Sequence, residues 1–447
     1  MTTTVVAKKT FAHGVHPPTH KDGTVKREIR QFPFANVLII ALSQHLGAPA
    51  KPIVREGQEV RRGEKIAEAS GFVSVTMHAP VSGIIKKIGW APSLTGKMVM
   101  SIFLESYPAS GQTVEPSAPC DVNTATPEEI IAAIQEAGIV GLGGAAFPTH
   151  VKLKVPPDKA VDTLIINGVE CEPYLTTDHR VMLEQQDDIF MGIRYILKAT
   201  GAKRAIIGVE ANKPDAILSL RENIPSDLPV TVEAVKVKYP QGAEKMLITA
   251  LLDREVPSGG LPADSGSVVV NVATTAEIGR LLPLGRGIIE RSITITGPGV
   301  EKSGNYLIQI GTPLRYALEQ AGLKKNATRV ILGGPMMGFT VSSLDVPITK
   351  GTSGLLVLTD HESQLTIRKE YPCIGCSHCL DACPIFLNPS RLGRLAKFKQ
   401  YDAMAGEYNL MDCFECGSCS YVCPSNIPLV HYFRVAKGII RDKKAAS

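Results

Sequence analysis

Short apolar runs broken by glycine and proline fill the first 105 residues or so of the chain. Runs such as 52–54 and 83–85 are rich in β-type side chains and too short for helices, which predicts a small β-domain. The next stretch, 106–123, has almost no apolar periodicity and is predicted to be a linker. It contains several residues that break regular structure: Pro108, Gly111, Pro116 and Pro119.

Beyond the linker, helical and strand-like segments alternate. A helix is predicted to start at Thr126, because Thr126-Pro-Glu-Glu129 has the form of a capping box with proline at the first helical position. The apolar face that follows reaches Gly138. This alternation predicts an α/β domain with a largely parallel sheet. Its strands are expected at 163–166, 205–209, 230–237 and 268–272, and its later helices at 214–221, 243–252 and 275–282.

Two further segments complete the chain. Between 286 and 360 there is a strand at 292–296, a turn at 297–299 and a short helix entered at Thr312 that ends near Gly322, which predicts a small α+β module. From 361 to 447, short helical segments lie between cysteine-rich loops, and such loops depend for their structure on what the cysteines bind.

Length and charge limit the classes of function. A chain of 447 residues is expected to divide into three or four domains, and an excess of 48 Lys and Arg over 43 Asp and Glu is too small and scattered to indicate a nucleic-acid partner. The longest apolar run, 34–42, is about half as long as a membrane-spanning helix. The polar N-terminus has no signal-peptide pattern, so a cytoplasmic chain attached to a membrane through partners is expected.

Eight of the ten cysteines lie between 373 and 423, in two copies of one pattern. In each copy two residues separate each of the first three cysteines from the next, and three residues separate the third from a fourth that precedes a proline. The copies are Cys373-Ile-Gly-Cys376-Ser-His-Cys379-Leu-Asp-Ala-Cys383-Pro and Cys413-Phe-Glu-Cys416-Gly-Ser-Cys419-Ser-Tyr-Val-Cys423-Pro. The pattern is that of bacterial ferredoxins with two [4Fe–4S] clusters. Two zinc sites are the alternative, but zinc motifs usually place pairs of ligands far apart and lack the third cysteine.

The expected ligand sets are crossed between the two copies. Three closely spaced thiolates hold one cluster, whereas the cysteine before the proline binds the cluster of the other copy. The first cluster is therefore predicted on Cys373, Cys376, Cys379 and Cys423, and the second on Cys413, Cys416, Cys419 and Cys383. Two adjacent clusters indicate an electron-transfer function.

A glycine-rich loop and a pair of carboxylates form a second candidate site. The loop, Gly141-Leu-Gly-Gly-Ala-Ala-Phe-Pro-Thr-His-Val-Lys152, offers backbone N–H groups for a phosphate and a lysine charge, although many such loops are only turns. The segment Asn167-Gly-Val-Glu-Cys-Glu-Pro173 follows a strand-like run, which places an amide and two carboxylates at the edge where α/β sheets bind ligands.

These two segments resemble the flavin- and NADH-binding subunit of respiratory complex I, the 51-kDa type. Tyr239-Pro-Gln-Gly242-Ala-Glu244 and Val270-Asn-Val-Ala-Thr274 are similar to two later segments of that flavin site, in the same order. With the cysteine region, the opening Phe11-Ala-His-Gly-Val-His-Pro-Pro and Gly333-Gly-Pro-Met-Met-Gly338, nearly the whole chain resembles the C subunit of Rnf complexes, the ion-translocating ferredoxin:NAD oxidoreductases.

The resemblance implies roles for particular residues. Gly141, Gly143, Gly144, Asn167 and Asn271 would hold FMN, with Thr274 near its phosphate. The side of the nicotinamide nucleotide would be lined by Lys152, Glu170, Glu172, Tyr239 and Glu244. Gly242 is a further expected cofactor-binding residue. Four positions depart from the complex I pattern: Leu142 stands for an arginine, Ala146 for a glycine, Val169 for an aspartate and Ala243 for a glutamate. No general acid or base is assigned.

The resemblance also implies four domains. They are a barrel-sandwich (lipoyl-like) domain with its linker over 1–118, a Rossmann-like FMN/NADH-binding α/β domain over 119–285, a soluble-ligand-binding β-grasp domain over 286–360 and a helical 2[4Fe–4S] ferredoxin-type domain over 361–447. The position of a lipoyl-type carrier lysine falls near Phe72, which argues against swinging-arm chemistry.

The resulting hypothesis is an NADH-oxidising or NAD-reducing translocase subunit. It would carry FMN and two [4Fe–4S] clusters, use NAD(H) as substrate, and work on the cytoplasmic face of the membrane with a ferredoxin-like cluster subunit and integral membrane subunits. Two alternatives stay open: a flavin-free iron–sulfur relay or adaptor, supported by the four altered positions, and a dicluster subunit of a soluble flavoprotein dehydrogenase.

Overall fold

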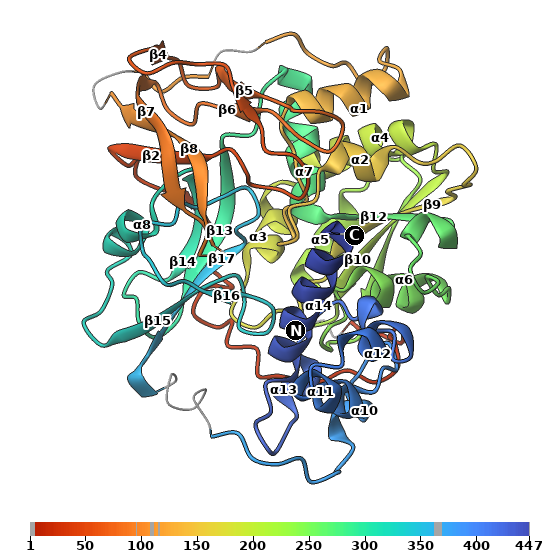
Figure 1. The fold of residues 1–447 in the computed structure, drawn as a ribbon. Coiled ribbons are helices and arrows are strands. Elements are labelled where there is room, and N and C mark those ends of the chain that lie inside the picture. Colours follow the sequence, from red (N-terminus) through yellow and green to blue (C-terminus); the bar gives the residue numbers. More distant parts are fainter. Residues whose placement is uncertain (1–4, 95, 108–110, 115–116, 362–368, 447) are drawn as a thin grey trace.

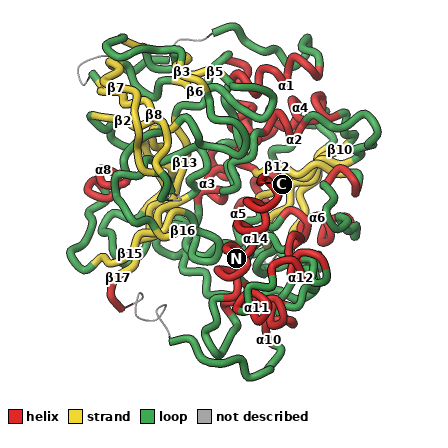
Figure 2. The backbone as a smooth tube through the Cα atoms, in the orientation of Figure 1, coloured by secondary structure: helices red, strands yellow, loops and turns green. Residues whose placement is uncertain are grey.

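A computed structural model describes residues 5–94, 96–107, 111–114, 117–361 and 369–446. Figure 1 shows a mixed arrangement of sheets and helices, with the C-terminal helical part set below the α/β sheet. Figure 2 separates the strands into two groups, one on each side of the molecule in that view.

A four-stranded parallel sheet forms the centre of the α/β domain, as predicted. Its order is β11-β10-β9-β12, and each neighbouring pair is parallel. The strands are β9 (Thr163–Gly168), β10 (Arg204–Glu210), β11 (Val230–Val235) and β12 (Ser267–Asn271). Because all four strands run the same way, their carboxyl ends share one edge, where an α/β fold binds ligands.

Helices cover both faces of this sheet. The helix predicted at Thr126 is confirmed, because the Thr126 side chain accepts the Glu129 N–H and the Glu129 carboxylate accepts the Thr126 N–H. The end of the predicted strand at 268–272 was wrong by one residue, since Val272 begins a helix that Asn271 caps. The helices are α1 (Pro127–Glu136), α2 (Thr149–Leu153), α3 (Thr177–Glu184), α4 (Gln186–Thr200), α5 (Pro214–Glu222), α6 (Glu244–Leu252) and α7 (Val272–Leu281).

The N-terminal β-domain consists of two small sheets, ordered β2-β8-β7-β4 and β3-β5-β6. Of the predicted run 52–54, only Pro52 lies in a strand. The core of this domain is continuous with that of the α/β domain, since Leu38, Ile85 and Leu104 belong to the same buried cluster as Ile130 and Leu164. The strands are β2 (Val37–Ala41), β3 (Lys51–Pro52), β4 (Glu59–Val60), β5 (Lys65–Glu68), β6 (Met77–His78), β7 (Gly83–Pro92) and β8 (Met98–Ser106).

The module after the α/β domain contains a six-stranded sheet and the helix α8 (Leu314–Gln320). Its order is β1-β14-β13-β17-β15-β16, so β1 (Ile29–Gln31) joins it from the N-terminal part of the chain as a parallel edge strand. The other strands are β13 (Glu290–Thr296), β14 (Gly304–Gln309), β15 (Ala327–Leu332), β16 (Phe339–Thr340) and β17 (Gly354–Thr359).

The cysteine-rich part folds as a helical module with its own core, which includes Leu392, Met404 and Phe433. The longest helix, α14, follows the second cysteine run and packs against α11 and α12 of the same module. The helices are α10 (His378–Asp381), α11 (Pro389–Lys397), α12 (Tyr401–Gly406), α13 (Ser418–Tyr421) and α14 (Leu429–Ala446).

Candidate functional site

Loops from β9, β11 and β12 meet at the carboxyl edge of the parallel sheet. The Asn167 amide donates to the Gly242 carbonyl at 2.8 Å, and the Asn167 side-chain oxygen accepts the Val169 N–H at 3.1 Å. Gly242 is required here, because a Cβ atom on it would lie 2.5 Å from the Val169 carbonyl oxygen. Asn167 therefore ties together two segments that the sequence assigns to one site.

The glycine-rich loop between α1 and α2 lies beside the start of α7. The Leu142 N–H donates to the Thr274 hydroxyl at 2.9 Å, and a Cβ on Gly143 would be 3.5 Å from the Asn271 side chain. Asn271 caps α7 by accepting the Thr274 N–H at 3.2 Å. Gly144 has a φ of +108° and open space where a Cβ would stand. A cradle of backbone groups open on one side suits a phosphate or a flat ring.

Lys152 and Glu244 face one another across this edge. The Lys152 ammonium lies 2.6 Å from the Glu244 carboxylate and 2.9 Å from the Val269 carbonyl oxygen. Both side chains are about one-third exposed, at 33% and 34%. The pair is therefore reachable by a ligand from solvent.

Buried charges lie beneath the same loops. The Glu170 carboxylate accepts the Asp178 N–H at 2.9 Å and lies 3.6 Å from the Lys21 ammonium, which comes from the N-terminal arm. One Glu170 oxygen, Oε2, is buried without a hydrogen bond. A second buried pair, Lys213 and Glu210, is only 2% and 3% exposed. Burial lowers the pKa of Lys21, against the attraction of Glu170.

Two acids at this edge hold their protons unusually tightly. Burial raises the pKa of Asp178 to about 7, assisted by the neighbouring Glu170 charge and opposed by a hydrogen bond from Asn271. Burial also raises the pKa of Glu172 to about 7, although its carboxylate accepts the Met336 and Met337 N–H groups. Sites that handle charge frequently perturb acids in this way.

The raised pKa of Asp178 predicts a pH effect on stability. The folded chain keeps this carboxyl protonated at pH values where the unfolded chain has released the proton, so the free energy of unfolding falls as pH rises toward the folded pKa. Between about pH 6 and about pH 8, the free energy of unfolding should therefore fall by about 1 kcal/mol less in Asp178→Asn than in wild type. Urea unfolding of the chain at both pH values measures this. The exposed Asp22→Asn serves as control, and equal pH dependence in wild type and Asp178→Asn would contradict the prediction.

The four departures from the complex I pattern have structural accounts. Leu142 is buried, and its carbonyl accepts a hydrogen bond from Arg291, a buried arginine of β13, at 3.0 Å. Ala146 keeps a left-handed φ of +50° despite its Cβ. Val169 packs in an apolar cluster against α6, and Ala243 starts that helix without a side-chain cap.

Sequence reasoning missed the buried cations that hold the glycine loop. Arg291 donates to the carbonyls of Leu142 and Lys350, and the Lys350 ammonium donates to those of Thr76 and Gly138. Burial lowers the pKa of Lys350 to about 7 and that of Arg291 to about 10. A signal for Arg291 existed, because it is a charged residue in a strand that continues with apolar and hydroxyl-bearing side chains.

The second cysteine run encloses a cavity with a residue of the first run. Cys383 lines it together with Cys413, Cys416 and Cys419. In the other group, the pKa of the Cys379 thiol is raised by burial and then by Cys423, Cys373 and Cys376. The cysteines that lie near one another in each group are thus the same as those in each predicted crossed ligand set. Burial also raises the pKa of Cys413 to about 11, a cost that binding of iron to the thiolates would offset.

No three Cys, His, Asp or Glu side chains in the described part of the chain converge closely enough to hold one metal ion. A cubane cluster does not require this, because its irons hold the four cysteine sulfurs apart at separate corners. His378, which lies within the first run, is exposed.

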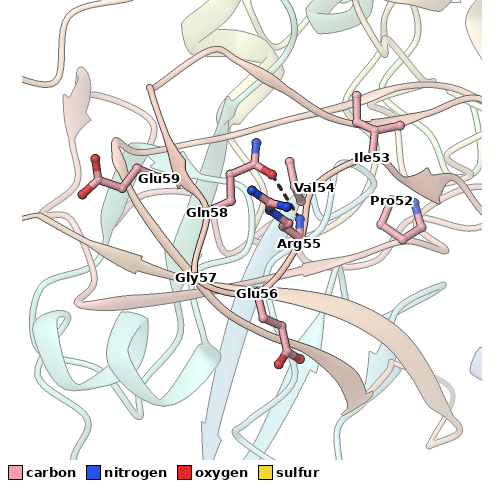
Figure 3. A pocket seen from close by; sticks show the side chains of 8 residues that line it. All are labelled: Pro52, Ile53, Val54, Arg55, Glu56, Gly57, Gln58 and Glu59. Atoms are coloured by element: carbon pink, nitrogen blue, oxygen red, sulfur yellow. Dashed lines mark hydrogen bonds between the residues drawn. The ribbon is translucent and has the colours of Figure 1, made fainter.

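A surface hollow along residues 52–59 lies away from these groups, in the N-terminal β-domain. Figure 3 shows that it is a turn in which the Glu56 and Glu59 side chains point apart. The Gln58 side chain accepts the Arg55 N–H at 3.1 Å. None of the candidate residues lines it.

The residues present fit the implied groups. The glycine loop leaves open space at Gly144, and the Lys152 and Glu244 side chains at the same sheet edge are partly exposed, which suits a bound flavin and nucleotide. The cavity of four thiols, buried to different degrees and drawn from both cysteine runs, suits a [4Fe–4S] cluster.

Comparison with protein families assigns four domains to the chain. Residues 9–107 match the RnfC barrel sandwich hybrid domain, and residues 134–280 match the Nuo51 FMN-binding domain. Residues 292–340 match the SLBB domain, and residues 372–427 match the 4Fe-4S dicluster domain. The predicted fold class is confirmed, as are FMN and two [4Fe–4S] clusters as cofactors.

Full-length relatives are also similar. The C subunit of the proton-translocating ferredoxin:NAD(+) oxidoreductase complex of Clostridium ljungdahlii is 44% identical, covering 96% of this chain and 93% of the relative. The corresponding C subunit of the Na(+)-translocating complex of Acetobacterium woodii is 42% identical, covering 96% of both. That of the ion-translocating oxidoreductase complex of Rhodobacter capsulatus is 39% identical, covering 97% of this chain and 83% of the relative.

A solved structure shares the fold. A chain of the NAD+-reducing [NiFe]-hydrogenase in its air-oxidized state aligns with a TM-score of 0.52 and 20% identity, covering 74% of this chain and 69% of that one. Within the described residues, no helix has the length and apolar character needed to cross a membrane.

Proposed function

Because the chain belongs to the family of C subunits of ion-translocating ferredoxin:NAD oxidoreductase (Rnf) complexes, we propose that it exchanges electrons between NADH and two [4Fe–4S] clusters through FMN. One observation carries this proposal. The candidate flavin loops and the second cysteine run pack against each other, with Tyr239, Cys171, Met336 and Cys416 in one apolar group. Oxidation of NADH and one-electron transfer therefore have adjacent sites in one chain.

The chain's own residues have these proposed roles. Gly141, Gly143 and Gly144 present backbone groups to FMN, while Asn167, Asn271 and Thr274 fix the loops around it. The side on which the nucleotide docks is formed by Lys152, Glu170, Glu172, Tyr239 and Glu244, and Gly242 is a further cofactor-binding residue. FMN supplies the conversion between two-electron hydride transfer and one-electron transfer.

The clusters are proposed on the crossed cysteine sets. Cys373, Cys376, Cys379 and Cys423 hold one, and Cys413, Cys416, Cys419 and Cys383 hold the other. Support comes from the cavity that Cys383 shares with the second run.

The partners proposed for the chain are a ferredoxin-like cluster subunit and integral membrane subunits that move ions, on the cytoplasmic face of the membrane. The complexes named for the relatives are ion-translocating, which supports this assignment. Co-purification with integral membrane subunits tests it. Isolation with a soluble flavoprotein dehydrogenase instead would favour the alternative of a soluble enzyme.

Lys152→Met tests the proposed nucleotide side. Removing the ammonium should raise the KM for NADH about tenfold, the effect of one charge-assisted contact, and leave the flavin content unchanged. Oxidation of NADH by the flavin-loaded chain, with an artificial electron acceptor, gives the measurement. Lys154→Met is the matched control, since its ammonium lies over the Phe72 ring instead. A chain that oxidises no NADH at all would favour the flavin-free relay.

A further inference from the structure

The loop of the second cysteine run is fastened to the α/β domain through Tyr239. The Tyr239 hydroxyl donates to the backbone carbonyl of Cys416 at 2.7 Å, and the Tyr239 side chain is only 1% exposed. Tyr239 follows β11 at the carboxyl edge of the sheet, next to Gly242. A residue of the candidate flavin site thus directly contacts a residue that is a proposed cluster ligand.

Two further attachments hold the same loop. Asp412 accepts hydrogen bonds from the Ser258 hydroxyl at 2.5 Å and the Gly259 N–H at 3.1 Å. On the other side, a Cβ on Gly417 would lie 2.8 Å from the Met336 carbonyl oxygen. The Glu172 carboxylate holds the loop of Met336 by accepting its N–H at 3.1 Å. Residues 412–417 are therefore fixed against the flavin side of the molecule.

The loop of the first cysteine run lies in a different setting. Residues 371–378 are all exposed, including Cys373 and Cys376, and Ile374 is 71% exposed. Within the described residues, the hydrogen bonds of 371–377 stay inside the cysteine module, as between the Tyr371 N–H and the Ser425 carbonyl. The loop that carries Cys373 and Cys376 is therefore exposed to solvent, whereas the loop that carries Cys413 and Cys416 packs against the flavin side.

We infer that the cluster on Cys413, Cys416, Cys419 and Cys383 is the inner carrier, that the cluster on Cys373, Cys376, Cys379 and Cys423 is the outer one, and that Tyr239 positions the inner cluster. The inference rests on the proposed function. Each step moves one electron: the inner cluster is reduced as the flavin site is oxidised by one electron, and it is reoxidised as the outer cluster is reduced. The opposite direction uses the same order in reverse.

Tyr239→Phe is the test, because it keeps the packed ring and removes the hydroxyl alone. Without its donor, the Cys416 carbonyl dipole is less compensated, so the inner cluster becomes harder to reduce. At a fixed potential, the ratio of reduced to oxidised inner cluster should fall about three- to tenfold, which corresponds to the net free energy of one hydrogen bond. The outer cluster should be unchanged. Tyr316→Phe is the matched control, since the Tyr316 hydroxyl also donates to a backbone carbonyl, that of Phe34, at 2.9 Å.

A redox titration with dithionite and mediators, followed by electron paramagnetic resonance, reads this out in the full chain without NADH. The inner cluster's signal is identified as the one lost in Cys413→Ala. A shift confined to that signal supports the inference, whereas no shift, or a shift of the signal lost in Cys373→Ala, overturns it. Rapid mixing of the wild-type chain with NADH tests the order in which the clusters are reduced. The signal that is lost in Cys413→Ala should form first. If NADH reduces neither flavin nor clusters, the proposed function fails, and the titration still decides the role of Tyr239.

Discussion

Cys383→Ala is expected to abolish the same cluster as Cys416→Ala, although Cys383 belongs to the other cysteine run. Cys383 is buried and lines the cavity formed by Cys413, Cys416 and Cys419. Loss of its thiolate removes one of the four corner ligands of the cluster, so bound iron should fall from about eight to about four per chain. Iron analysis and electron paramagnetic resonance of the reconstituted variants measure the loss.

Variants of the first cysteine run decide whether the ligand sets are crossed. Cys376→Ala should abolish the other signal, and Cys120→Ala, a cysteine outside both runs, should abolish neither. If Cys383→Ala and Cys376→Ala remove the same signal, the ligand sets are not crossed, and the assignment of Cys423 fails with that of Cys383.

Gly144→Val is expected to abolish tight flavin binding while the chain stays folded. Gly144 has a φ of +108°, a conformation that a β-branched residue adopts only with strain, and it lies exposed in the loop proposed to hold FMN. The side chain would also enter the space left open for a ligand. Affinity for FMN should fall at least about a hundredfold, because both the shape and the backbone groups of the cradle are changed.

Gly57→Val is the matched control for strain. Gly57 has a φ of +81° and, like Gly144, no atom within 4 Å of a Cβ position, but it lies in a turn of the barrel-sandwich domain. Its variant should bind FMN as wild type does in a fluorescence titration, and its circular dichroism should match that of Gly144→Val. Equal FMN affinity in both variants would exclude the glycine loop from the flavin site.

Local patterns predicted the features that depend on neighbours in sequence. The capping box at Thr126 and the strands of the parallel sheet are encoded within a few residues, and both are present. Helix α4 was missed although its signal was available. Ile189, Ile193 and Ile196 recur at helical spacing, and Gly201 ends the helix in the left-handed conformation.

Contacts between distant segments were beyond sequence reasoning. Tyr239 and Cys416 are 177 residues apart, and no periodicity links them. The Arg291 guanidinium reaches the Leu142 carbonyl from a different domain, a contact that the residues around position 142 do not indicate. Likewise, the pairing of β1 with β14 joins residues that a linear division places in separate domains.

Anaerobic reconstitution of the full chain with iron, sulfide and FMN tests the central claim most directly. After assay of bound flavin and iron, NADH is added and the visible spectrum is followed. The account predicts about eight irons per chain, a bound flavin that NADH bleaches, and bleaching of the clusters after it. A chain that holds its iron but binds no flavin and does not respond to NADH would contradict the account and identify the chain as a relay.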